Sequence, residues 1–226
     1  MYLDTATFEQ IAASLAHEVK NPLSLVKANI DLLQLCDETN QYETNYRIMR
    51  REIDRINNLL IDFIQIANPP TIGTAQVSIN QLLNDLCDSF SNTYRNRIHF
   101  CLDFNSNEFT ATADEKKLRQ VFYNVIKNGI ESIEGKYGSN CTNGLIAIDA
   151  TMLGDYIKIA ISDNGGGITD ETQEKINKPF YTTKQGGSGL GLFFCKSVVS
   201  RHNGTFEIAN NAGEAGGCTV TICIPI

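Results

Sequence analysis

Two asparagines, Asn124 and Asn128, combine a residue type and a spacing that could bind a metal ion. They fall within a predicted helix over 114–134, where a spacing of four places both amides on one face. A carboxamide oxygen is a neutral, hard ligand that suits Mg²⁺, which keeps several waters and substrate phosphate oxygens around itself. The alternative is a pair of exposed polar helix residues with no such role.

A second candidate follows a short apolar segment, in the run Asp163-Asn164-Gly165-Gly166-Gly167. An aspartate at the end of a strand can accept a hydrogen bond from the exocyclic amine of adenine. Glycines beside it let the chain turn closely along a flat base. Turns that contain Asp and Gly are common, so this run alone does not indicate a ligand.

A third candidate is a glycine-rich segment that precedes an apolar helix predicted over 190–201. Its members are Gly186, Gly187, Gly189, Leu190 and Gly191. Backbone N–H groups at such a helix start can bind phosphates, assisted by the helix dipole. The segment lacks the Gly-Lys-Ser/Thr ending of a Walker P-loop, so it belongs to another class of phosphate site.

The residues between these two glycine-rich segments show little apolar periodicity, and a long loop of that kind is typical of a lid. Within it, Thr183 and Lys184 end the run 178–184. Lys184 is placed to reach phosphates, with an ordinary solvated lysine as the alternative.

The segment 5–36 predicts one long amphipathic helix. On a helical wheel its apolar residues share an arc of about 100°, and they are Ile11, Leu15, Val19, Pro22, Val26, Ile30 and Leu33. His17 falls opposite that arc, whereas a core histidine would lie within it, so we expect His17 to face outward. The other histidines are His99, in a predicted strand, and His202, which is expected to close a helix C-terminus.

A second amphipathic helix is predicted over 43–67, and a turn-rich stretch joins it to the first. A hairpin of two such helices is too thin to bury its own core. Pairing with a second copy would give a dimeric four-helix bundle. Two prolines then begin a linker at 69–76, so that domains are expected over 1–68 and 77–226.

The pattern after the linker changes to mixed helices and strands. Besides the two helices already named, it predicts a helix over 79–90 and strands over 98–104, 145–151, 156–163, 205–209 and 219–224. Helices and an antiparallel-rich sheet in separate layers make an α/β sandwich. The expected fold class is therefore a helical hairpin followed by an α/β-sandwich domain.

The composition limits the classes of partner that are expected for this chain. The net charge of −7 argues against nucleic acid as the main partner, because Lys and Arg are not in excess. No apolar run approaches the roughly 20 residues that cross a bilayer, so no membrane contact is expected within this chain. Seven cysteines without a Cys-x-x-Cys pair indicate reduced thiols in a cytosolic compartment. We expect buried spectator cysteines, with oxidation sensing as the alternative.

The four clusters, taken in chain order with the run 178–184 third and the glycine-rich segment fourth, resemble the N, G1, F and G2 boxes of the Bergerat-type ATPase fold shared by histidine kinases, Hsp90, DNA gyrase and MutL. The resemblance covers about residues 77–226. It implies ATP and Mg²⁺ as ligands, with Asn128 on the metal, Asn124 by the phosphates and Asp163 on adenine. It also implies that the nucleotide site includes Gly165, Gly167, Thr183, Lys184, Gly187, Gly189, Leu190 and Gly191.

The segment 14–23, Ser-Leu-Ala-His-Glu-Val-Lys-Asn-Pro-Leu, resembles the H box of the commonest histidine kinase dimerisation domain. This resemblance implies that His17 is the phospho-acceptor and Glu18 its general base. Asn21 matches a position that helps to place water for dephosphorylation of the partner regulator. The subgroup looks similar to nitrogen-regulation and sporulation kinases, although Lys178 stands where many relatives have Glu.

The resemblance as a whole implies a cytoplasmic protein-histidine kinase. It would autophosphorylate at His17 as a homodimer and pass the phosphoryl group to an aspartate of a response-regulator receiver domain. Such kinases usually carry a sensor upstream, so the chain looks like a core fragment or a short soluble form. Two alternatives stay open, namely a nucleotide-binding dimeric scaffold without phosphotransfer, and an ATPase or serine kinase of the same superfamily.

Overall fold

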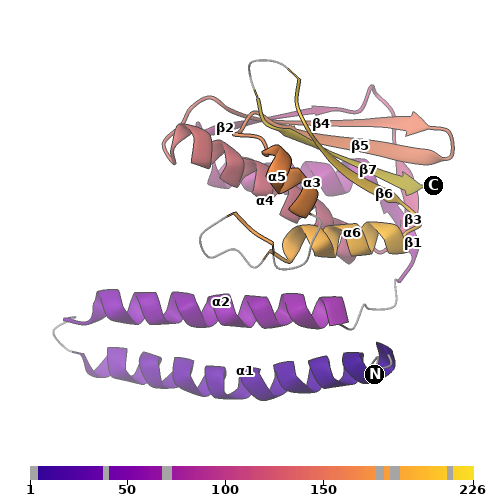
Figure 1. Cartoon of the computed structure of the whole chain (residues 1–226). Helices are drawn as coiled ribbons and strands as arrows, with labels where there is room; N and C mark the ends of the chain where they lie inside the picture. Colours follow the sequence, from indigo (N-terminus) through magenta and orange to yellow (C-terminus); the bar gives the residue numbers. More distant parts are fainter. Residues whose placement is uncertain (1–4, 38–40, 68–72, 177–180, 184–188, 213–215) are drawn as a thin grey trace. The chain divides into compact units, whose positions relative to one another are not determined.

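The computed structural model describes residues 5–37, 41–67, 73–176, 181–183, 189–212 and 216–226, apart from the side chains of 5–18, 55, 57–67, 170 and 174. The chain divides into two compact units, Met1–Thr71 and Ile72–Ile226, each with its own core (Figure 1). Within the described residues, no helix is both long enough and apolar enough to span a bilayer.

The first unit is a hairpin of two helices, α1 (Thr5–Cys36) and α2 (Glu43–Ala67), with the bounds that the sequence predicts. Helix α1 continues through Pro22. Its contact with α2 buries Ile30 against Tyr46 and Ile53, while Leu23 packs beside them. Among the described side chains this core is small, as expected for two helices alone.

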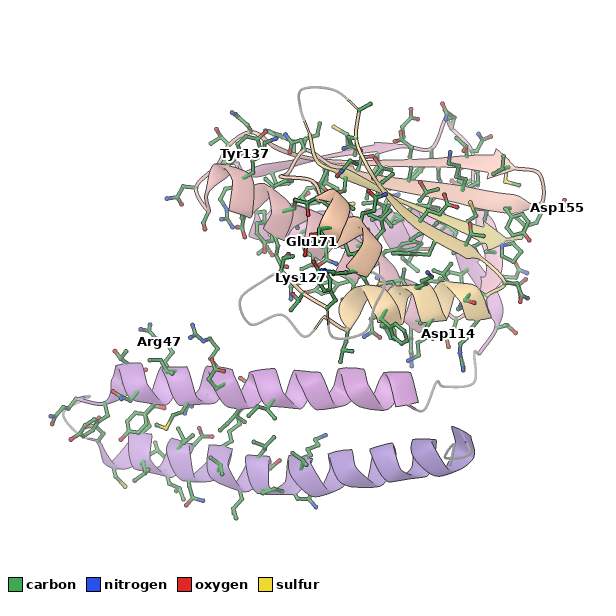
Figure 2. The ribbon with its side chains drawn as sticks, in the orientation of Figure 1. Arg47, Asp114, Lys127, Tyr137, Asp155 and Glu171 are labelled. Carbon is green, nitrogen blue, oxygen red and sulfur yellow. The ribbon has the colours of Figure 1, made fainter. Side chains whose placement is uncertain are left out.

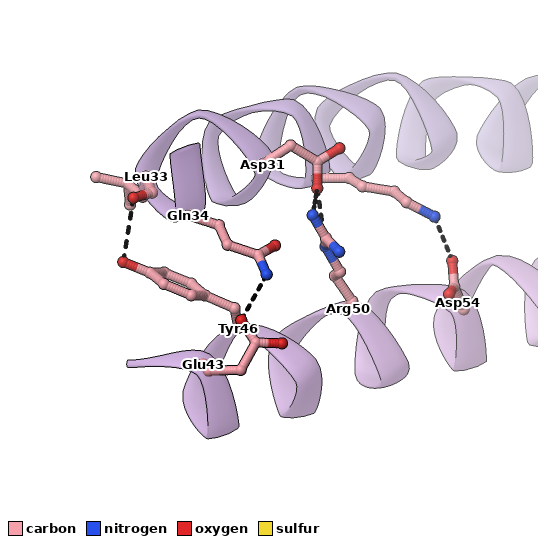
Figure 3. Close-up of polar contacts among 8 residues, drawn as sticks. Asp31, Leu33, Gln34, Glu43, Tyr46, Arg50 and Asp54 are labelled. Carbon is pink, nitrogen blue, oxygen red and sulfur yellow. Dashed lines mark hydrogen bonds and ion pairs between the residues drawn. The ribbon is translucent and has the colours of Figure 1, made fainter. Parts of the chain in front are cut away.

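Ion pairs line one edge of the hairpin (Figure 3). Lys27 Nζ lies 2.7 Å from Asp54 Oδ1, and Arg50 Nη2 lies 2.7 Å from Asp31 Oδ1. On a helical wheel, each of these residues lies about 60° to 100° after the buried position of its helix. All four therefore fall on the same side of the hairpin. One edge of the hairpin is therefore polar and ion-paired.

The opposite edge is apolar and exposed. Its residues stand about 40° to 60° before the buried positions of their helices, and they are Val26 (49% exposed), Leu33 (58%), Met49 (38%) and Ile56 (39%). We call this set the open apolar edge. Val26 and Leu33 belong to the predicted apolar stripe of α1, yet α2 does not cover them.

The second unit is built on a five-stranded sheet in the order β2-β4-β5-β7-β6. Its strands are β2 (Ile98–Asp103), β4 (Gly144–Leu153), β5 (Tyr156–Asp163), β6 (Thr205–Asn210) and β7 (Cys218–Pro225). Strand β2 runs parallel to β4, and the other neighbours are antiparallel. Helices α3 (Ile79–Thr93), α4 (Glu115–Tyr137) and α6 (Gly191–Arg201) cover one face (Figure 1). The predicted α/β sandwich is confirmed.

Three short elements were not expected from the sequence. Strand β1 (Ala75–Ser78) pairs antiparallel with β3 (Thr110–Ala113), and α5 (Asp170–Lys175) lies in the segment predicted as a lid without structure. Residues 75 and 76 thus belong to a strand rather than to the linker. These elements carry few large apolar side chains, so periodicity did not reveal them.

The cysteines are all free, and burial differs among them. Cys87, Cys141, Cys195 and Cys218 are buried. Burial raises the pKa of Cys87 and Cys195 to about 12 and that of Cys218 to about 11, so these thiols stay protonated at neutral pH. The expectation of buried cysteines is wrong for Cys36 and Cys101, which are exposed.

Candidate functional site

Asp163 ends β5 in the middle of the sheet, and its carboxylate is half-buried. Burial raises the pKa of this carboxyl above its ordinary value. Hydrogen bonds from the Gly165 and Cys218 N–H groups and from the Ser132 hydroxyl act against that rise, as does the positive charge of Lys136. The Gly165 bond to Asp163 Oδ1 is 2.8 Å long. A carboxylate held in this way at a strand end is an oriented hydrogen-bond acceptor.

Helix α4 approaches Asp163 closely because two glycines remove side chains from the contact. A Cβ on Gly129 would lie 2.8 Å from Ile146 Cδ1, and one on Gly165 would lie 2.2 Å from Ser132 Oγ. Ser132 Oγ in turn accepts a hydrogen bond from the Gly166 N–H at 3.1 Å. Gly129 and Ser132 therefore shape the candidate site, and the sequence analysis missed both. A glycine inside a helical pattern was the available signal.

The two asparagines of α4 are partly buried rather than exposed. The side chain of Asn124 is hydrogen-bonded to the thiol of Cys195 on α6. The thiol donates its one proton to the Val121 carbonyl at 3.7 Å, so its sulfur is the acceptor in the bond with the Asn124 amide. Asn124 therefore lies where α4 packs on α6, and Asn128 follows one turn later on the same face.

The start of α6 has the backbone features of an anion site. Gly189 has a positive φ of 66°, Leu190 is buried, and no side chain caps the N-terminus of the helix. N–H groups at such a start can donate hydrogen bonds to phosphate oxygens. Gly191 is the first residue of the helix, while Lys184 and Gly187 lie outside the described residues.

The remaining nucleotide-site candidates differ in position. Gly167 is half-buried with a φ of +74°, and a Cβ there would lie 3.0 Å from Asn210 Oδ1. Thr183 is exposed. Tyr181, two residues before it, directs its hydroxyl to Thr172 Oγ1 of α5 at 3.3 Å. Within the predicted lid, Tyr181 thus anchors the described residues 181–183 to α5.

The helix that carries His17 is α1, but the side chains of His17 and Glu18 are outside the described residues. Asn21 follows one turn later and is exposed. His202 caps α6, as expected, and both of its ring nitrogens have backbone partners, so it is unsuited to accept a phosphoryl group. His99 is exposed on β2.

The donor set fits a cation that is held largely by phosphate oxygens. In the described part of the chain no three His, Cys, Asp or Glu side chains gather to hold a metal by themselves. The neutral amide of Asn128 would suit Mg²⁺ as one ligand beside phosphates and water.

Two known families match the chain. The family described as "Histidine kinase-, DNA gyrase B-, and HSP90-like ATPase" matches residues 113–226, and the "His Kinase A (phospho-acceptor) domain" matches residues 9–71. Sporulation kinase B of Bacillus subtilis (strain 168) is 33% identical over 221 residues, which cover 96% of this chain and 49% of the relative. The chain spans about half the length, or less, of the curated relatives it matches.

Two solved structures share the fold. The full-length structure of ShkA in complex with AMPPNP matches with a TM-score of 0.80 and 22% identity, over 96% of this chain and 45% of that one. Histidine kinase ThkA in complex with response regulator protein TrrA matches with a TM-score of 0.67 and 23% identity, over 96% and 61%. Both support the fold, a helical region followed by an α/β domain.

Proposed function

This chain belongs to the histidine kinase family, and from that premise we propose that it binds Mg-ATP in its second unit and transfers the γ-phosphoryl group to His17. The whole protein would then be a sensor histidine kinase like the sporulation kinases that it resembles.

The observation that carries the proposal is the setting of Asp163. Its carboxylate is oriented by two N–H groups and one hydroxyl, at the end of a buried strand and against a helix that lacks a side chain at Gly129. An ionised acceptor of this kind suits the exocyclic amine of adenine. The triphosphate would extend toward the asparagines of α4 and the start of α6.

Phosphate binding would be shared between α6 and α4. The N–H groups at the start of α6, around Gly191, would donate hydrogen bonds to phosphate oxygens, and the amide oxygen of Asn128 would hold Mg²⁺, which would supply positive charge to neutralise the phosphates. The nucleotide-bound structure of ShkA, which has the same fold, is consistent with this use of the second unit.

The transfer itself would be an in-line displacement. His17 Nε2 forms a bond to the γ-phosphorus while the bond from that phosphorus to the bridging oxygen of ADP breaks. Glu18 would accept a hydrogen bond from Nδ1–H, which leaves Nε2 free as the nucleophile and stabilises positive charge on the ring. Phosphoryl transfer depends mainly on positioning and charge neutralisation, so little further covalent chemistry is needed.

A homodimer is the expected assembly of the first unit. The open apolar edge leaves Val26, Leu33, Met49 and Ile56 in contact with solvent, and a second hairpin would bury them. Among the described side chains, the other edge carries the ion-paired residues Lys27, Asp31, Arg50 and Asp54, which supports pairing through the open apolar edge.

The partner after autophosphorylation would be an aspartate of a response-regulator receiver domain, in the cytoplasm. ThkA, which shares the fold, has been crystallised with a response regulator. Exposed Asn21, one turn after His17, could place water for the reverse reaction on that regulator, so phosphatase activity is part of the proposal.

The test is labelling with γ-³²P ATP and Mg²⁺. We expect an acid-labile phosphoprotein from the wild type and none from His17→Ala, with ATP affinity unchanged in that variant. Label that remains in His17→Ala would overturn the acceptor assignment. Acid-stable label would favour a serine kinase, and bound ATP without any label would favour the dimeric scaffold.

A further inference from the structure

We propose that Asn210 and Asn211 are positioning residues of the nucleotide site. They stand at the end of β6 and directly after it, and their side-chain amides hold the segment 163–168, which carries Asp163. The inference rests on the proposed function, because it takes Asp163 as the residue that binds adenine.

Asn210 holds the far end of that segment by two hydrogen bonds to one residue. Its Oδ1 accepts from the Ile168 N–H at 2.8 Å, and its Nδ2 donates to the Ile168 carbonyl at 2.6 Å. The Asn210 side chain thus forms the two hydrogen bonds that the backbone of a neighbouring strand would form with Ile168. Gly167, with its φ of +74°, permits the approach, since a Cβ there would crowd Asn210 Oδ1 at 3.0 Å.

Asn211 holds the near end. Its Nδ2 donates to the Asp163 carbonyl at 2.8 Å and to the Gly216 carbonyl at 3.3 Å. Its Oδ1 accepts from the Thr219 hydroxyl at 2.5 Å, and this bond orients the amide. Because the Thr219 hydroxyl donates to Asn211, the Ser162 hydroxyl, 2.6 Å away, is the donor to Thr219.

The chain around Asn211 is fitted closely to Asp163. Gly217 has a φ of +91°, and a Cβ there would lie 1.9 Å from the Asp163 carbonyl oxygen. Only glycine allows β7 to begin against that carbonyl. The Asn211 N–H donates to the Gly217 carbonyl at 3.0 Å, which joins the two sides of this contact.

These bonds control the position of the Asp163 carboxylate and not its charge. Both amides bind backbone atoms on either side of the carboxylate, whereas the groups on the carboxylate itself come from Gly165, Cys218 and Ser132. After Asp163, residues 164–168 continue from β5 as irregular backbone, so their course depends on such side-chain bonds. Loss of an amide would therefore displace the acceptor from the adenine amine.

The test compares two nucleotides that differ at that amine. Dissociation constants would be measured for ATP and for inosine triphosphate, which has a carbonyl oxygen in place of the amine. We expect Asn210→Ala and Asn211→Ala each to weaken ATP binding about tenfold, the effect of about two lost hydrogen bonds. The dissociation constant for inosine triphosphate should change by less than about twofold. Asn143→Ala is the matched control, because Asn143 is exposed and, among the described residues, its side chain accepts a hydrogen bond from the neighbouring Thr142 hydroxyl.

The outcomes separate this inference from the proposed function. A wild type that fails to bind ATP would overturn the proposed function. A wild type that prefers ATP, together with asparagine variants that keep the same preference, would overturn this inference alone. An equal loss of affinity for both nucleotides would also overturn it, since general destabilisation of the domain gives that result. If an alanine variant does not fold, Asn211→Ser keeps a hydroxyl at the position, and the same ratio decides.

Discussion

His202 Nε2 accepts a hydrogen bond from the backbone N–H of Asp114 at 3.0 Å, so the C-cap residue of α6 holds the N-cap of α4. Asp114 is labelled in Figure 2. The tautomer follows, because an accepting Nε2 leaves the proton on Nδ1, which donates to the Val198 carbonyl at 2.8 Å. Asp114 then accepts from the Lys117 N–H through Oδ1. The helix with the asparagines is thereby fixed to the helix with the glycine-rich start.

Replacing His202 should destabilise the second unit. His202→Ala leaves the Asp114 N–H without its partner and opens a buried site, which we expect to cost about 1–3 kcal/mol of the free energy of unfolding. Denaturant unfolding of the chain measures the change. His99→Ala is the control, since His99 is exposed, and it should stay within about 0.5 kcal/mol. Equal stability of the two variants would contradict the role given to His202.

The affinity for ATP should fall on acidification through Asp163. Its pKa is raised in the folded chain by burial, so the carboxylate protonates at a higher pH than an ordinary aspartate, whose pKa is about 3.9. Protonation removes the charged acceptor for the adenine amine. Fluorescence titration of a labelled ATP analogue between neutral and acidic pH measures this, and Asp163→Asn should show a flatter profile.

The effect of Asp163 on the stability of the fold should have the opposite pH dependence: it should be more favourable in acid than at neutral pH. A carboxyl with a raised folded-state pKa favours folding fully below its unfolded pKa, and that contribution is lost as pH rises through the folded pKa. Asp163→Asn should therefore gain stability relative to the wild type near neutral pH and not in acid. Thermal melts at both ends of the range check this sign, and a wild-type advantage at neutral pH would refute it.

The Asn128 side chain should contribute to the affinity for ATP only when Mg²⁺ is present. We expect Asn128→Ala to lose about tenfold or more of its affinity for Mg-ATP, and to bind ATP in the presence of a chelator much as the wild type does. Isothermal titration with and without the metal gives both values. Asn128→Asp keeps an oxygen ligand and should retain part of the Mg²⁺ effect. An Asn128→Ala protein with a full metal effect would remove Asn128 from the metal site.

The dimer should depend on one edge of the hairpin. Leu33 (58% exposed) belongs to the open apolar edge, and its neighbour Leu32 (59%) points away from it on the same helix. Leu33→Asp would bury a charge at the interface of both copies, and we expect the dimer to weaken by about 3 kcal/mol or more. Leu32→Asp is the matched control. Sedimentation equilibrium distinguishes them, and equal dissociation constants would place the interface elsewhere.

Long elements with strong periodicity could be predicted from the sequence. Helices α1 and α2 have the expected bounds, and β5 does as well, because each carries a one-sided or alternating apolar pattern. Strand β3, which reads Thr-Ala-Thr-Ala, offers small side chains that give no such signal. Helix α5 is six polar residues and depends on its cap, Thr169, which accepts from the Thr172 N–H.

Asp163 and Asn128 could be identified from the sequence as candidate site residues, because four motifs together resemble those of a known ATPase fold. The residues that orient Asp163 could not, because Ser132, Asn210 and Asn211 act through contacts between segments far apart in the chain. Asparagine near a turn has an ordinary explanation as a turn residue. Only the hydrogen-bond distances, from the Asn210 amide to Ile168 and from the Asn211 amide to the Asp163 carbonyl, distinguish that explanation from a positioning role.

The two unlike edges of the hairpin also determine how far assembly can proceed. A two-fold contact is isologous, so each copy presents the same edge to the other, and the open apolar edge is used up when two copies meet. The ion pairs Lys27–Asp54 and Arg50–Asp31 would then face outward on both copies of the proposed dimer. A helical pair with two apolar edges could add further copies without limit, whereas the proposed pairing through one edge would close at two.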